Sequence, residues 1–210
     1  KALKRFKSFA YKTSHNNSRR CFVLKCDIRK FFASIDQDKM LNIITKYVAD
    51  EEVGELSSQV VRSFSVSPRK GLPLGNLTSQ LLVNVYMNEF DQFVKQTLRV
   101  KYYIRYADDF VVMSHHKEYL EKVLSRMEEF LAGSLKLSMH PDKVFIKTLS
   151  SGVDFLGWVH FPHHRVLRTS TKRRMFKNLS IKSSPETMAS YLGMLKHGDT
   201  FKISQKISNN

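Results

Sequence analysis

The stretch Tyr102–Ser114, YYIRYADDFVVMS, places two adjacent aspartates between two runs of aromatic and β-branched residues. Such runs favour strands, and the short break between them predicts a β-hairpin with Asp108 and Asp109 at its tip. Two neighbouring carboxylates repel each other, so this arrangement is costly unless a cation or water offsets the charge. The hairpin therefore predicts a cation site, with a turn whose acids simply face solvent as the alternative.

The segments around this hairpin mix strands and helices. We expect strands over residues 21–28, 144–148 and 153–161, and helices after Asp36, over 56–64, from Asn76 or Thr78 to Lys95, and over 118–131 with a stop near Gly133. Beyond Pro162 the chain becomes basic and helical, with a helix start at Pro185 and Gly198 after its end. This order predicts an α+β fold, an antiparallel sheet with helices on one face.

Charge is distributed unevenly along the 210 residues, which carry 35 Lys and Arg against 19 Asp and Glu, a net charge of +16. Residues 1–30 have a net charge of +9, residues 161–210 of +8, and the middle of −1. Two separate basic blocks indicate a polyanionic partner such as nucleic acid, with solvated basic faces as the alternative.

Several classes of protein are excluded by composition. Cys21 and Cys26 are too few for a disulfide scaffold and lack the second pair of a zinc site. No run of about 18 apolar residues and no signal-peptide pattern occurs, so we expect a cytoplasmic protein with no membrane partner. The histidines His160, His163 and His164 lack nearby ligands at metal-binding spacing, which favours a solvated or RNA-facing turn.

A third acid, Asp27, ends the first predicted strand. Carboxylate oxygens suit Mg²⁺, which takes one or two carboxylates per ion together with substrate phosphates. Two such ions can activate an attacking oxygen and stabilise a pyrophosphate leaving group. The three aspartates therefore predict a metal-dependent site.

Five blocks carry a resemblance to reverse transcriptases. Tyr106–Asp109 resembles the Y-x-D-D box of that family, and Lys25–Ile35, KCDIRKFFASI, resembles its first catalytic block. The remaining blocks are Gly71–Gln80 (GLPLGNLTSQ), similar to the loop facing template and nucleotide, Leu137–Lys143 (LSMHPDK), and Phe155–Trp158 (FLGW), similar to the primer-grip hairpin. All five occur in the family's order.

The resemblance implies the fold and domains of a polymerase palm followed by a helical thumb. Residues 1–20 would be a remnant of the fingers or a connection, 21–161 the catalytic palm and 162–210 a partial thumb. Because only 26 residues precede Asp27, we expect the fingers to be largely absent and the isolated chain to polymerise poorly.

The resemblance also implies roles for individual residues. Two Mg²⁺ ions, with Mn²⁺ as a substitute, would be held by Asp27, Asp108, Asp109 and the backbone carbonyl of Ile28. Lys143 would protonate the leaving pyrophosphate, with a solvated surface lysine as the alternative.

Substrate contacts are implied in the same way. The nucleotide would contact Lys30, Phe31, Phe32, Leu74 and Gly75. Phe32 matches the aromatic steric gate that excludes a 2′-hydroxyl, although core packing is the alternative for Phe31 and Phe32. The template and primer would contact Tyr106, Ser79, Gln80, Gly157 and Trp158.

One departure narrows the subfamily. The loop Leu74–Gln80 has a hydrophobic residue before its glycine and Ser-Gln at its end. This resembles the reverse transcriptases of diversity-generating retroelements, which copy a template RNA with errors at adenines. We therefore expect an RNA-directed DNA polymerase, bacterial or phage-encoded, that uses an RNA template, a DNA or RNA primer, dNTPs and a small basic accessory protein. A group II intron maturase, a retron enzyme and a non-catalytic RNA-binding module are the alternatives.

Overall fold

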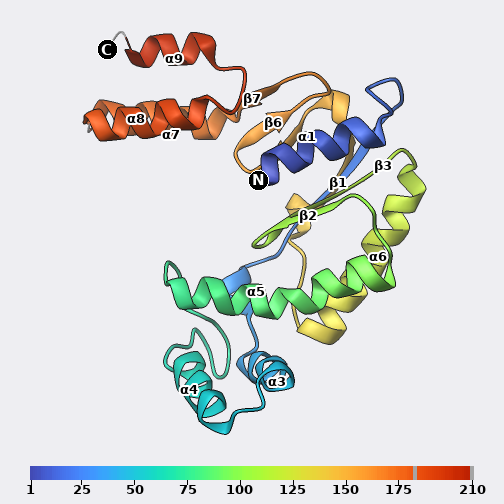
Figure 1. Ribbon diagram of the computed structural model, residues 1–210, viewed down its shortest axis with the longest axis vertical. Coiled ribbons are helices and arrows are strands. Elements are labelled where there is room, and N and C mark those ends of the chain that lie inside the picture. The colour runs from blue at the N-terminus through green and yellow to red at the C-terminus, as the bar shows by residue number, and fades with distance from the viewer. Residues whose placement is uncertain (182–183, 209–210) are drawn as a thin grey trace.

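A four-stranded antiparallel sheet forms the centre of the computed structural model, which describes residues 1–181 and 184–208 (Figure 1). Its strands are β1 (Phe22–Asp27), β2 (Tyr103–Tyr106), β3 (Asp109–Ser114) and β4 (Phe145–Thr148), in the order β2-β3-β1-β4. The predicted hairpin is confirmed as β2 and β3. Strand β1 lies between β3 and β4, so the segment that ends in Asp27 is an inner strand of the sheet.

Helices α5 (Leu77–Gln92) and α6 (Lys117–Leu135) cover one face of this sheet (Figure 1). Leu24 and Cys26 of β1 point to that face and join the largest hydrophobic core, because alternate residues of a strand share a face. The α+β fold with an antiparallel sheet is thus confirmed. Helix α6 continues past Gly133, where the sequence predicted a stop, because buried Leu131 and Leu135 extend its apolar stripe.

The opposite face of the sheet is covered by α1 (Ala2–Thr13), a feature that the one-sided prediction missed. Phe6 and Ala10 of this helix pack into a second core with Val23 of β1 and Val111 of β3. Residues of α1 therefore pack on the sheet, while the domain boundary at residue 20 stays a prediction.

Two helices precede α5, namely α3 (Gln37–Tyr47) and α4 (Glu51–Arg62), after the short α2 (Phe31–Ser34). Each begins at an aspartate whose side chain accepts a backbone N–H, at Asp36 for α3 and Asp50 for α4. Asn76 caps α5 in the same way, which settles the choice between Asn76 and Thr78. Helix α4 starts earlier than predicted because the cap at Asp50 was not recognised.

Short irregular helices complete the connections. They are a π-helix at Phe93–Thr97 that extends α5, and 3₁₀ turns at Pro141–Lys143 and Leu149–Ser151.

A second sheet, β5-β6-β7, connects the centre to the C-terminal helices. It contains β5 (Val153–Phe155), β6 (Trp158–His160) and β7 (Arg165–Leu167), and is followed by α7 (Thr169–Ile181), α8 (Pro185–Leu195) and α9 (Phe201–Ser208). The helical region begins at Thr169, not directly after Pro162, because β7 pairs with β6. The starts at Pro185 and the turn at Gly198 are confirmed. Residues 182–183 and 209–210 of the predicted thumb lie outside the described residues.

Trp158 joins this sheet to the C-terminal helices, since it forms a core with Leu167, Met175, Leu195 and Ile207. Gly198 lies so close to its ring that an added Cβ would meet it at 2.0 Å. Only a glycine fits there without displacement of the ring or the backbone.

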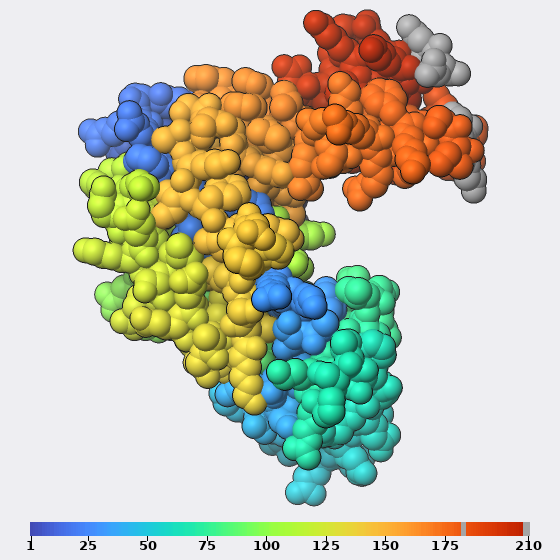
Figure 2. All heavy atoms as spheres, turned by 180° about the vertical axis from the view of Figure 1, so that it is seen from behind, coloured from blue at the N-terminus to red at the C-terminus, as the bar shows by residue number. Residues whose placement is uncertain are grey.

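A hollow opens between α7 and α8 on one side and the start of α5 on the other (Figure 2). Within residues 1–181 and 184–208, no helix combines the length and apolar character needed to cross a membrane.

Candidate active site

The three aspartates meet at one end of the central sheet. Asp27 at the end of β1 lies directly opposite Asp109 at the start of β3 in the antiparallel register. Asp108 lies in the preceding turn, and its carbonyl accepts the N–H of Ile28 at 3.3 Å. We call the segment Tyr106–Asp109 the aspartate turn. The structure therefore brings together the acids that the sequence singled out from two separate segments.

Two lysines contact these carboxylates. Lys143 Nζ lies 3.1 Å from Asp27 Oδ1. Lys25 Nζ lies 3.1 Å from Asp109 Oδ1, and Lys25 is only 8% exposed. Residues two apart on a strand share a face, so Lys25 and Asp27 point to the same side of β1 as Val23 and the α1 core.

The pKa values of the two acids of the aspartate turn are raised. The pKa of Asp109 is raised to about 6, mainly by burial and also by the nearby negative charges of Asp27 and Asp108, against the opposing effect of Lys25. Burial is also the main cause of the raised pKa of Asp108. Three carboxylates meet only two lysines at this end of the sheet, which leaves an excess of negative charge.

The donor set suits a hard cation such as Mg²⁺. Asp109 Oδ1 is buried, and no donor in the described part of the chain meets it with hydrogen-bond geometry, although Lys25 is within ion-pair distance. Among these same residues no group of three acids, histidines or cysteines is close enough to hold a metal alone. The site fits an ion that takes one or two carboxylates and completes its shell with water and substrate oxygens.

The backbone carbonyl of Ile28 takes no part in the two hydrogen bonds that close the antiparallel bridge beside Asp27. The bridge between Ile28 and Met139 is closed by Arg29 N to Ser138 O at 2.9 Å and His140 N to Asp27 O at 2.8 Å. The same bridge holds the segment that leads to Lys143 against the end of β1.

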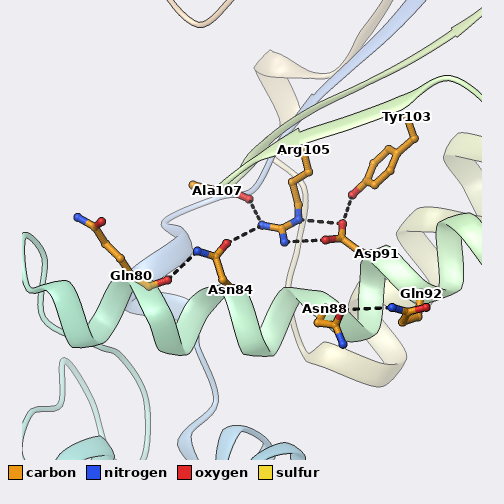
Figure 3. A network of polar contacts seen from close by, with 8 residues as sticks. All are labelled: Gln80, Asn84, Asn88, Asp91, Gln92, Tyr103, Arg105 and Ala107. Carbon is orange, nitrogen blue, oxygen red and sulfur yellow. Dashed lines mark hydrogen bonds and ion pairs between the residues drawn. The ribbon is translucent and has the colours of Figure 1, made fainter. Parts of the chain in front are cut away.

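A polar network supports the aspartate turn from the α5 side (Figure 3). Arg105 of β2 donates from Nε to Asp91 Oδ1 at 2.9 Å and from Nη2 to Asp91 Oδ2 at 2.8 Å. Its Nη1 donates to the carbonyl of Ala107 at 3.1 Å and lies 3.4 Å from Asn84 Oδ1. Tyr103 adds a hydrogen bond from its hydroxyl to Asp91 Oδ1 at 2.7 Å.

Ala107 adopts a left-handed backbone conformation with φ of 54°. This conformation costs a residue with a Cβ roughly 1 to 3 kcal/mol. Surrounding contacts must hold it, and the hydrogen bond from Arg105 is one of them. Arg105 therefore packs within the protein and is not placed to reach a substrate phosphate.

The residues after β1 separate into buried and accessible ones. Phe31 is 3% exposed and lies in the main core, so its predicted contact with a nucleotide would require rearrangement. Phe32 is only partly buried and packs on the edge of that core, with its ring centroid 5.5 Å from that of Phe31. Lys30 is exposed and has a left-handed φ of 45°. Packing thus accounts for Phe31, while Phe32 and Lys30 remain available.

The loop before α5 is open. Leu74 is 79% exposed, and Gly75 has a φ of 80° that favours glycine, with no atom within 4 Å of an added Cβ. Gln80 is exposed but Ser79 is buried, so the predicted contact of Ser79 with template or primer is not supported by its position. Adjacent helical residues point in different directions, which separates these two.

The residues predicted to face the primer also differ in exposure. Tyr106 is exposed on the aspartate turn. Gly157 lies in the β5–β6 turn with φ of 81°. Trp158 is buried against the C-terminal helices, so its predicted contact with the primer is not supported.

His160, Cys21 and Cys26 are buried within the protein. His160 is buried, with its Nε2 3.3 Å from the carbonyl of Phe155, and burial lowers its pKa to about 4. Cys21 and Cys26 are both free and buried. His160 thus lies in the buried strand β6 and not in the solvated or RNA-facing turn that the sequence predicted for it.

Sequence reasoning missed Lys25, Asp91 and the supporting role of Arg105. Lys25 carried a signal, because a lysine on an apolar strand two residues before Asp27 must share the face of that aspartate. Asp91 carried none, since a helical acid gives no indication of its partner on a later strand.

Comparisons with known proteins identify the family of this chain. A family model described as reverse transcriptase (RNA-dependent DNA polymerase) matches residues 2–160. Protein YkfC of Escherichia coli K12 is 23% identical over 198 residues, which cover 76% of this chain and 50% of that protein. The retron Ec73 reverse transcriptase of Escherichia coli is 25% identical over 206 residues, covering 92% of this chain and 63% of that protein.

The group II intron-encoded protein LtrA of Lactococcus lactis subsp. cremoris is 22% identical over 219 residues, covering 72% of this chain and 36% of that protein. The chain thus spans between about a third and two thirds of the length of these three relatives. Among solved structures, apo telomerase from Candida tropicalis superposes with a TM-score of 0.63 at 10% identity, covering 82% of this chain and 36% of that one. This likeness supports the fold.

Proposed function

Because this chain belongs to the reverse transcriptase family, we propose that it carries the catalytic centre of an RNA-directed DNA polymerase. The reaction joins the 3′-hydroxyl of a DNA or RNA primer to the α-phosphate of a dNTP and releases pyrophosphate, with an RNA template selecting the nucleotide. The observation that carries the proposal is the meeting of Asp27 with Asp108 and Asp109 at one end of the sheet.

Asp27, Asp108, Asp109 and the Ile28 carbonyl would hold two Mg²⁺ ions. The three carboxylates are paired with only two lysines, Lys25 and Lys143, and this supports the role, because a site with excess negative charge favours cations. Bound Mg²⁺ supplies positive charge to the transferring phosphates. The chain itself orients the primer end and the triphosphate, which accounts for much of the rate of such reactions.

Lys143 is the residue proposed as proton donor. Its ammonium contacts Asp27 through one oxygen only and the side chain is half exposed, so it can turn toward a leaving pyrophosphate. Phe32 is the residue proposed to exclude the 2′-hydroxyl of a ribonucleotide. Phe32→Ala should then admit ribonucleotides, and unchanged sugar selectivity would remove this assignment.

Primer extension by the full-length protein on an RNA template with Mg²⁺ tests the function. Asp108→Asn should lower synthesis at least about 1,000-fold, since it removes a charge on which positioning and neutralisation depend. Glu128→Gln, an exposed change on α6, is the matched control and should keep full activity. Equal RNA binding by wild type and Asp108→Asn without synthesis by either would support the rival, a non-catalytic RNA-binding module.

The subfamily proposal rests on the loop before α5. Leu74 cannot donate or accept the side-chain hydrogen bonds that a glutamine would make, so discrimination near the incoming nucleotide would be weaker. This supports error-prone cDNA synthesis in a diversity-generating retroelement, and a small basic accessory protein would belong to that system. Leu74→Gln should reduce misincorporation opposite template adenine several-fold. An unchanged error spectrum would favour the retron or group II intron maturase alternatives.

A further inference from the structure

The side chain of Arg105 connects helix α5 to the aspartate turn (Figure 3). We infer that the Asp91–Arg105 pair is a positioning device that sets the backbone of the aspartate turn, and thereby the placement of Asp108 and Asp109. The inference rests on the proposed catalytic role of these two acids and goes beyond it, because Asp91 and Arg105 belong to none of the predicted substrate or metal contacts.

The pair acts from the side of the sheet opposite the acids. Tyr103 of β2 lies in the α5 core and Ile104 in the α1 core, so Arg105 shares the α5 face of the strand. Asp109 is opposite Tyr106, on the α1 face with Lys25. Arg105 therefore reaches the site through the backbone of the turn and has no direct path to a substrate beside Asp109.

The contacts of the Arg105 guanidinium group fix the direction in which its third nitrogen points. Two of its nitrogens bind both oxygens of Asp91, and this two-point contact fixes the plane of the group. The third nitrogen is thereby aimed at the carbonyl of Ala107, the residue with the left-handed backbone. A lysine offers a single charged point and cannot hold both contacts in one plane.

Asp91 is itself anchored. Its carboxylate also accepts the hydroxyl of Tyr103, and it lies in the last turn of α5. A contribution to stability does not explain why a charged pair occupies this position, because an apolar pair of similar volume often stabilises a protein equally well. The directed contact with Ala107 supplies an explanation that stability alone does not.

The contacts continue along α5 toward its start. Asn84 lies beside Arg105 Nη1 and donates from its own amide to the carbonyl of Gln80 at 2.9 Å. The helix that follows the Leu74–Gly75 loop is thus tied to the aspartate turn by polar contacts at two positions. A displacement of α5 should therefore displace the aspartate turn, and the reverse.

Asp91→Asn and Arg105→Lys in the full-length protein test the inference. We expect each to lower the rate of nucleotide addition per active site about 10- to 100-fold and to raise the Mg²⁺ concentration for half-maximal rate, as changes behind metal ligands do. Burst amplitudes count the active sites, so partial unfolding would lower the amplitude and leave the rate per site unchanged. RNA affinity should stay within about 2-fold of wild type.

Asp38→Asn is the matched control. Asp38 lies between Arg62 and Arg69 on the exposed side of α3, far along the chain from the aspartate turn, and its loss should leave rate and Mg²⁺ dependence unchanged. The double variant Asp91→Asn/Arg105→Gln removes both charges and avoids an unpaired buried ion if a single variant does not fold.

Two outcomes separate this inference from the proposed function. If Asp108→Asn abolishes synthesis while folded Asp91 and double variants keep the wild-type rate and Mg²⁺ dependence, the positioning role is overturned and the proposed function stands. If Asp108→Asn remains active, the proposed function itself fails. A rate loss per site that appears with Arg105→Lys and with the double variant supports the inference.

Discussion

Asp91 and the pair Asp108–Asp109 lie on opposite faces of the same hairpin, and their surroundings differ in kind. Asp91 receives two nitrogens of one arginine and a tyrosine hydroxyl, so both of its oxygens are bonded. Asp109 has one lysine at ion-pair distance and a buried oxygen without a hydrogen bond, and its pKa is raised. The carboxylate of Asp91 belongs to a scaffold, whereas that of Asp109 retains capacity for a cation.

The largest expected effect is that substitutions of Asp91 and of Asp108 change the free energy of unfolding in opposite directions. Asp91→Asn leaves the buried Arg105 charge without its partner and should lower the free energy of unfolding by about 3 to 5 kcal/mol. Asp108→Asn removes repulsion and should raise it by about 1 kcal/mol in metal-free buffer at pH 7.5. Urea unfolding measures both, and changes of the same sign would contradict the comparison.

The second prediction concerns pH. Because the pKa of Asp109 is raised to about 6 in the folded protein, its contribution to stability is full below about pH 4 and is lost as pH rises through 6. In metal-free buffer, the unfolding free energy of wild type relative to Asp109→Asn should fall by about 2 to 3 kcal/mol over this range. Saturating Mg²⁺ should abolish the slope, and a flat difference curve without metal would refute the prediction.

Lys143 provides the third prediction. Because this lysine contacts a single oxygen of Asp27, its replacement should spare stability and affect the reaction. Lys143→Ala should slow nucleotide addition about 100-fold, as loss of a general acid does. Lys122→Ala on the exposed side of α6 is the control for loss of one positive charge. Equal rates for the two variants in rapid-quench experiments would show that Lys143 is a solvated surface lysine and not the proton donor.

The smallest expected effect is stabilisation by metal. Mg²⁺ at about ten times its dissociation constant should raise the free energy of unfolding by about 1.4 kcal/mol, because it binds the folded state only. The gain should disappear in Asp108→Asn and persist in Asp38→Asn. KCl at matched ionic strength is the control for screening of surface charge. An equal gain in Asp108→Asn would place the ion elsewhere.

The hairpin and its acids could be predicted because their signals are local. Alternating apolar strands and a two-residue break fix the position of Asp108, and the register then places Asp109 opposite Asp27. The placement of Lys25 could have been predicted by the same alternation rule, because residues two apart on a strand share a face. A single lysine on a strand is a weak signal compared with three aspartates.

Burial of individual side chains could not be predicted in the same way. Phe31, Ser79 and Trp158 belong to motifs that face substrate in the resemblance, but each is buried here. Trp158 packs against residues that lie 9 to 49 positions later in the chain, namely Leu167, Met175, Leu195 and Ile207. The link between Asp91 and Arg105 likewise depends on how α5 crosses the sheet, which no local pattern encodes.

The contact between Trp158 and Gly198 has a practical consequence, because Trp158 is the only tryptophan in the chain. Its indole is enclosed between the second sheet and the C-terminal helices, while the aspartates lie on the central sheet. Tryptophan fluorescence, excited at wavelengths that the eight tyrosines do not absorb, is therefore an optical reporter of this junction alone. A red shift in emission would register separation of the C-terminal helices while the far-ultraviolet signal of the central sheet and its helices remained intact.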